Sequence, residues 1–88
     1  MKKSSYREQD YAFGKLMLRL RLATGLTQAG LAQRLEVSRN AVGDWEVGQS
    51  YPTAEHLKAF IVLALQQQVW AFGREAEEVR ALWRAAHH

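Results

Sequence analysis

Apolar residues recur at helical spacing in five stretches of the chain, and no stretch alternates apolar and polar residues as a strand does. The first stretch starts near Tyr6, where Ser5 and Glu8 have capping-box spacing, or at Asp10, and it ends at Thr24. The others cover about 28–35, 39–45, 54 to the break before Gly73, and 74–86. The pattern therefore predicts an all-α fold of five helices.

The two short central helices have the clearest boundaries. Thr27 and Ser38 each stand directly before a helical pattern, where a hydroxyl can accept from a backbone N–H of the first turn. Apolar residues flank both caps at the spacing of a hydrophobic staple. Helices of eight residues are unstable alone in water, because nucleation is costly. We therefore expect the two helices to pack on each other and on the helices around them.

The first helix carries apolar residues on two sides, and a helix of this kind is normally covered on both. One face holds Phe13, Leu16, Met17, Leu20 and Ala23, and a second stripe holds Tyr11, Leu18 and Leu22. We expect the fifth helix to fold back over the second faces of helices one and four.

Length and composition indicate one small domain over residues 1–88, with a core of about 10–70 and a C-terminal helix of about 74–86. The chain has no cysteine, which fits a cytoplasmic location. The N-terminus lacks the apolar region of a secretory signal, and the longest apolar run, 59–65, is too short to cross a bilayer. We expect no membrane contact.

Positive charge is concentrated at the N-terminus. Residues 1–25 carry six basic and two acidic side chains, whereas residues 26–53 carry Arg34 and Arg39 against Glu36, Asp44 and Glu46. An excess of this size is weak support for a polyanionic partner. The three histidines are not accompanied by other metal-ligating residues in a ligand spacing, and no nucleophile has a partner base, so we expect no metal, no cofactor and no catalysis.

The residues of the central stretch resemble one known family. The spacing of Gln28, Ala32, Val37, Ser38, Val42, Trp45, Glu46 and Pro52 is similar, without a gap, to that of the XRE-type helix-turn-helix family, which includes the lambda and 434 repressors. The resemblance covers about residues 13–65. It implies sequence-specific binding of double-stranded DNA through the major groove by a transcriptional regulator. The alternative is a protein–protein interaction module with the same fold.

With its Gln66-Gln67-Gln68 run and the helix that begins at Gly73-Arg74-Glu75, the whole chain is also similar to the N-terminal module of large bacterial proteins that join such a domain to a STAND or NB-ARC NTPase and often to WD40 repeats. This resemblance implies that the 88 residues are part of a longer chain. A homodimer, or tethered domains of a longer chain, would then supply a second DNA contact.

The resemblance assigns DNA contacts to the two central helices. Gln28, at the start of the helix of about 28–35, would bind a phosphate of the DNA backbone. Arg39 and Asn40 open the second, and their side chains can make paired hydrogen bonds with guanine and adenine. Asp44 has two interpretations: it accepts from cytosine N4, or it is a solvated acid that lowers affinity. Gly43 costs up to ~1 kcal/mol in a helix, and a glycine there would also permit backbones to approach closely.

The resemblance also implies phosphate contacts from the loop after these helices and an ion pair at the end of the second one. The loop 47–51 has no basic residue, so its candidates for phosphate contact are backbone amides, Gln49, Ser50 and Tyr51. Arg21 and Glu46 would form a partly buried ion pair that fixes the angle of the third helix. Glu36 stands at the turn position usually filled by glycine, where a left-handed conformation costs ~1–2 kcal/mol.

Overall fold

The structure is a computed structural model that describes residues 8–87, with the side chains of Glu8 and Gln9 excepted. It has five helices, and no residue in this range is in a strand. The helices are α1 (Glu8–Thr24), α2 (Gln28–Leu35), α3 (Arg39–Glu46), α4 (Ala54–Gln66) and α5 (Glu75–Ala86). The predicted all-α fold is therefore confirmed. The Ser5–Glu8 capping box and the start at Tyr6 lie outside the described residues.

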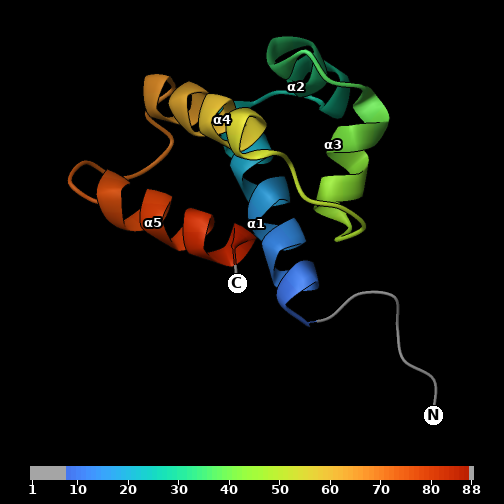
Figure 1. Cartoon of the computed structure of the whole chain (residues 1–88). Coiled ribbons are helices and arrows are strands. Elements are labelled where there is room, and N and C mark those ends of the chain that lie inside the picture. The colour runs from blue at the N-terminus through green and yellow to red at the C-terminus, as the bar shows by residue number, and fades with distance from the viewer. Residues whose placement is uncertain (1–7, 88) are drawn as a thin grey trace.

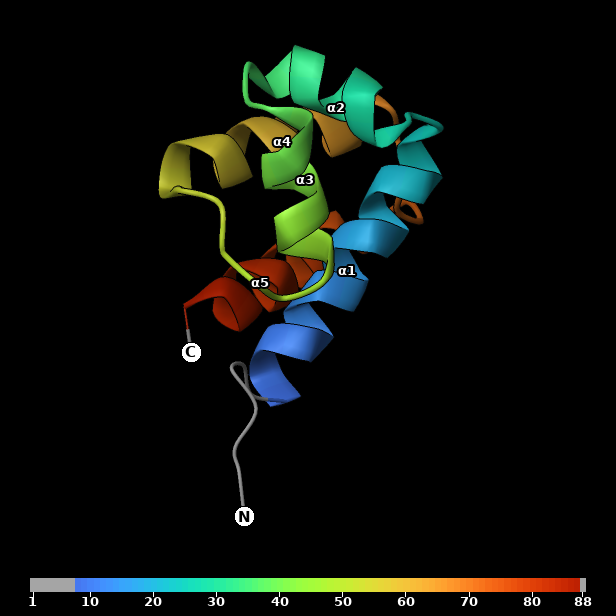
Figure 2. The same cartoon turned by 90° about the vertical axis from the view of Figure 1, so that its right-hand side faces the viewer.

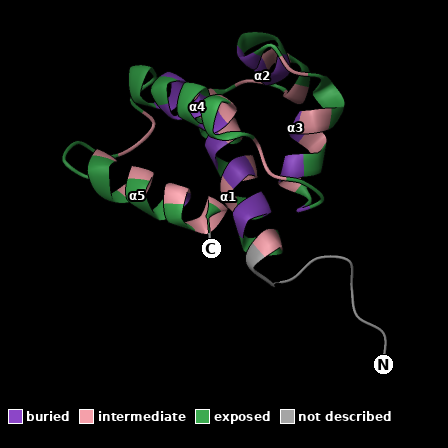
Figure 3. Cartoon of the chain, viewed as in Figure 1, coloured by how far each residue is buried: buried purple, intermediate pink, exposed green. Residues whose placement is uncertain are grey.

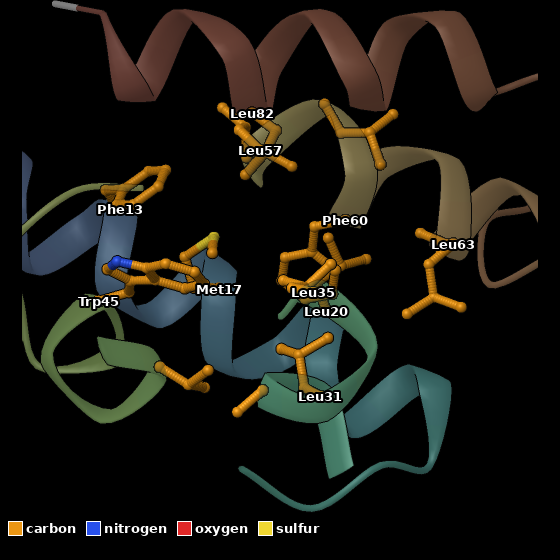
Figure 4. Close-up of a cluster of buried hydrophobic side chains, with 14 residues drawn as sticks. Phe13, Met17, Leu20, Leu31, Leu35, Trp45, Leu57, Phe60, Leu63 and Leu82 are labelled. Atoms are coloured by element: carbon orange, nitrogen blue, oxygen red, sulfur yellow. The ribbon is translucent and has the colours of Figure 1, made fainter. Parts of the chain in front are cut away.

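Helix α1 is the central element of the fold. Helix α3 packs on it from one side and α5 from the other, while α2 contacts both α3 and α4 (Figures 1 and 2). A single cluster of buried apolar side chains joins all five helices (Figure 4). Its largest fully buried members are Phe13, Met17, Leu31, Val42, Leu57 and Phe60.

Side-chain caps start three of the helices. The hydroxyl of Thr27 accepts from the N–H of Gly30 at 2.9 Å, and that of Ser38 accepts from the N–H of Ala41 at 3.0 Å. Thr53 caps α4 in the same way. The predicted caps at Thr27 and Ser38 are thus confirmed, and each satisfies one backbone donor that the first helical turn leaves without a partner.

Helix α4 is shorter than the apolar pattern predicts: it ends at Gln66, whereas the pattern extends almost to Gly73. Gln68 adopts a left-handed conformation with a φ of 54°, and the N–H of Val69 bonds back to the carbonyl of Ala64 at 3.3 Å. This is the hydrogen-bond pattern of a Schellman C-cap, which usually has glycine at the left-handed position. The end of α4 therefore falls within the glutamines 66–68, where no glycine or proline indicates a helix end in the sequence.

Helix α5 covers a different side of α1 from the one expected. It packs where Leu16, Leu20 and Ala23 lie, and these residues share a groove with Leu82 of α5. The second stripe is largely exposed, since Tyr11 is 53% exposed and Leu22 is 60% exposed, while Leu18 between them is half-buried. Figure 3 shows that the outer face of α5 is likewise exposed. Leu82 is buried in the same cluster as Leu57 of α4, and four partly buried residues of α5 pack against this core: Val79, Trp83, Ala85 and Ala86.

Candidate nucleic-acid interface

Helix α3 lies at the edge of the molecule, with one face in the core and the other toward solvent (Figures 2 and 3). Val42 and Trp45 are buried, at 0% and 3% exposure. Arg39 and Asn40, in the first helical turn, are exposed, and Asp44 follows them on the same side of the helix. The sequence thus leaves the polar end of α3 free to meet another molecule.

The turn between α2 and α3 is tight. Glu36 has φ 61° and ψ 43°, so it occupies the left-handed conformation that the sequence predicts at this position. The N–H of Val37 then bonds to the carbonyl of Ala32 at 3.0 Å, which closes the end of α2. The next residue, Ser38, already caps α3. This short connection fixes the angle between the two helices.

Arg21 and Glu46 clamp the far end of α3 to α1. Nε of Arg21 lies 2.6 Å from Oε2 of Glu46, and Nη2 donates to Oε1 at 3.2 Å. A third guanidinium donor, Nη1, bonds to the carbonyl of Leu26 at 3.0 Å. The side chains are only 11% and 6% exposed. The two charges therefore neutralise each other in a largely dry site and fix the orientation of α3.

Gln28 belongs to the same network. Its Nε2 donates to Oε1 of Glu46 at 2.9 Å, so the carboxamide joins the start of α2 to the end of α3. The first N–H groups of α2 have no partner within that helix and remain suited to a phosphate. The sequence did not reveal this contact with Glu46. The phosphate role of Gln28 stays a prediction.

The loop after α3 is anchored by Tyr51 rather than by charge. The ring of Tyr51 stacks on Phe13 with centroids 4.7 Å apart and an interplanar angle of 24°. Its hydroxyl donates to a carboxylate oxygen of Asp10 in α1. A phosphate contact from Tyr51 would have to replace this hydrogen bond beside an acidic side chain. Gln49, by contrast, is exposed, and its backbone N–H bonds to the carbonyl of Asp44 at 2.9 Å.

Asp10 and Gly14 are structural residues of this site that the sequence analysis missed. A Cβ on Gly14 would lie 2.6 Å from the carbonyl oxygen of Glu46, so α1 and α3 meet here by direct backbone contact. Gly14 could have been recognised in the sequence, because a glycine inside an apolar helical pattern often indicates that another backbone packs closely against the helix. Asp10 carried no comparable signal.

The electrostatics of the surface around α2 and α3 are close to neutral. Once Arg21 has neutralised Glu46, residues 26–53 present two arginines, Arg34 and Arg39, against Glu36 and Asp44. Few basic groups mean that few counterions are released from DNA, and sequence-independent attraction is correspondingly weak. Within the described residues no cluster of His, Asp and Glu is suited to a metal ion. No helix of residues 8–87 is long and apolar enough to span a bilayer.

Two capped helices joined by a tight turn, the second with an exposed polar N-terminal face, define a helix-turn-helix. Comparison with known families agrees: the helix-turn-helix family model matches residues 17–61, just over half of the chain. The chain belongs to this family, in its XRE-type form.

A curated relative extends the comparison. The HTH-type transcriptional activator BcrR of Enterococcus faecalis is 46% identical over 46 residues, which are 52% of this chain and 22% of that protein. The chain therefore matches about a fifth of the length of this relative. No solved structure matches the chain significantly. The family and the relative favour DNA-binding regulation over the alternative of a protein-interaction module.

Proposed function

We propose that this chain binds double-stranded DNA in a sequence-specific manner and acts as the DNA-binding part of a transcriptional regulator. The observation that carries the proposal is the exposed first turn of α3, where Arg39 and Asn40 stand on a helix clamped in place by Arg21 and Glu46. In a helix-turn-helix, these first residues of the second helix are the ones that meet base edges in the major groove. A DNA-binding role implies a cytoplasmic protein, and it needs no catalytic residue.

The chemistry and position of the exposed side chains support the following contacts. Arg39 can donate two hydrogen bonds to guanine O6 and N7, and Asn40 can pair with adenine N6 and N7. The N-terminus of α2 at Gln28 would hold a phosphate on the backbone, and Gln49 would hold another from the loop. These phosphate contacts fix the register, whereas the base contacts select the sequence.

A single copy of this surface should bind weakly, because residues 26–53 are nearly neutral once the Arg21–Glu46 pair is formed. We infer that a second DNA contact is needed, from a homodimer or from other domains of a longer chain. Two half-sites would then lie about 34–36 Å apart, or at a multiple of this distance. Sedimentation of the protein on DNA with one or two half-sites measures the stoichiometry directly.

The test is a selection from random double-stranded oligonucleotides, followed by binding measurements at about 50 and 200 mM salt, where counterion release makes affinities differ strongly. We expect one sequence to be enriched and the affinity to fall with salt. Arg39→Ala should reduce the affinity for the selected sequence about 5–150-fold, which is the loss of a bidentate base contact of ~1–3 kcal/mol. Arg80→Ala, which removes an exposed arginine of α5, is the matched control and should change little.

Two outcomes would contradict the proposal. In the first, no sequence is enriched and nothing binds at the lower salt concentration. In the second, Arg39→Ala and Arg80→Ala weaken binding equally, which would mean that α3 does not read the sequence.

A further inference from the structure

Three of the six glycines are explained by the backbone conformation. Gly25, Gly48 and Gly73 have φ angles of 80°, 81° and 89°, in the left-handed region that favours glycine. Each stands in a connection between helices. The fold itself therefore accounts for glycine at these three positions.

Two more glycines are explained by close packing inside helices. A Cβ on Gly14 would lie 2.6 Å from the carbonyl oxygen of Glu46, and one on Gly30 would lie 3.2 Å from the hydroxyl of Thr27. The first distance is impossible without moving the backbone of α3, and the second would disturb the cap of α2. Glycine is thus required at position 14, whereas at position 30 a side chain would have to displace the Thr27 hydroxyl by a few tenths of an ångström.

Gly43 is different, because nothing in the described part of the chain requires it. It lies inside α3, and unlike Gly25, Gly48 and Gly73 it does not have a positive φ. A Cβ at this position would meet only the carboxamide of Gln28, at 3.8 Å from Nε2 and 4.0 Å from Oε1, which are ordinary contact distances. Glycine in a helix interior is nevertheless less favourable than alanine, because it loses more backbone entropy on folding. The residue carries a cost without any benefit to the fold.

The position of Gly43 relates it to the proposed DNA contacts. It follows Asn40 by three residues and Arg39 by four, so all three share one side of α3. Val42 and Trp45 point the other way, into the core. Gly43 itself is half-buried, and the backbone of α3 there has only the Gln28 carboxamide within 4 Å of the position that a Cβ would take.

We propose that Gly43 is a specificity-determining position, whose missing side chain lets a base edge in the major groove lie directly against the backbone of α3. This inference rests on the proposed DNA binding. A side chain at 43 would hold the helix away from the bases, so Arg39 and Asn40 would lose their hydrogen-bond distances. Non-specific binding, which depends on phosphates around the helix, would change much less.

The test is Gly43→Ala, measured for thermal stability and for DNA binding. We expect the melting temperature to rise by about 3–8 °C, because alanine is the better helix former. We expect affinity for the selected sequence to fall about tenfold or more, while affinity for random DNA at low salt stays within about threefold. Stability and binding change in opposite directions, so misfolding is not an explanation. Ala76→Leu, which adds bulk at an exposed position of α5, is the control and should not affect binding.

Each contrary result has a distinct meaning. If the wild-type protein binds a selected sequence and Gly43→Ala binds it equally well, the inference is overturned while the proposed function stands. Equal losses on selected and random DNA would place the close contact at the DNA backbone, and a lower melting temperature would give the glycine a role in the fold. Both results would overturn the specificity role. If the wild-type protein binds no DNA, the proposed function itself fails.

Discussion

At the scale of single residues, the key interaction is the one among Arg21, Glu46 and Gln28. It joins the end of α3 to α1 and to the start of α2 within one nearly buried site. Such a pair contributes little net stability compared with well-packed apolar side chains, but it is costly to break from one side. Its value here is orientation, because α3 has only eight residues and its exposed end must be held at a fixed angle.

Arg21→Met alone should lower the stability strongly. Among the residues that the structure describes, the carboxylate of Glu46 would keep only Gln28 as a side-chain donor while remaining buried, and the free energy of unfolding should fall by about 3–5 kcal/mol. The double variant Arg21→Met, Glu46→Met removes both charges and should recover much of this loss. Urea unfolding of the two variants and the wild type measures both values. Equal stability of the single and double variants would show that the buried charge is not the cause.

Asp44 allows a second prediction at this scale. It is exposed on the same face as Arg39 and Asn40, where a carboxylate repels nearby phosphates. Removing one such repulsion, worth ~1 kcal/mol in water, should make Asp44→Asn bind DNA about fivefold more tightly at low salt. Glu77→Gln on α5 is the control for the change in net charge. Weaker binding of Asp44→Asn to the selected sequence alone would indicate instead that Asp44 accepts from cytosine N4.

At the scale of elements, the helices could be predicted wherever local chemistry marks their ends. Thr27 and Ser38 mark the starts of α2 and α3 in the sequence, because an N-cap hydrogen bond joins residues within a single helical turn. The end of α4 was missed because Gln68 adopts a left-handed conformation without being glycine, and the packing of Val69 and Trp70 against the core decides where the chain turns. The contacts of Gln28 and Tyr51 join residues far apart in the sequence, so no local pattern could reveal them.

The turn between α2 and α3 gives a prediction about an element. Glu36 holds a left-handed conformation at φ 61°, which strains a residue with a Cβ by ~1–2 kcal/mol. Glu36→Gly removes this strain but makes the unfolded chain more flexible, so we expect a net gain of about 0.5–1 kcal/mol in stability. Gln33→Gly, at an exposed position inside α2, is the control and should lose about 0.8–1.0 kcal/mol. Thermal unfolding distinguishes them, and a loss in both would mean that the turn is not strained.

At the scale of the whole molecule, α5 adds to the core from the side of α1 opposite the proposed DNA-binding face of α3. Helix α5 lies beyond residues 17–61, which the family model matches, and contacts α1 on the side away from α3 (Figure 1). Leu82 is its one buried residue, at 4% exposure. The apolar stripe predicted this helix, but the side of α1 that it was expected to cover was wrong. That choice depends on the combined shape of α1, α4 and the 67–74 connection, which no local pattern encodes.

This separation predicts the effect of Leu82→Ala. Removing a buried leucine side chain leaves a cavity, and the free energy of unfolding should fall by about 2–5 kcal/mol, a large share of the stability of a small domain. The folded fraction should keep the sequence preference of the wild type, because the clamp at Glu46 and the exposed face of α3 lie on the other side of α1. Chemical unfolding and DNA selection at a temperature well below the transition measure the two effects separately. A changed sequence preference would show that α5 also sets the orientation of α3 through α1, and stability and recognition would then have to be treated as one property of the domain.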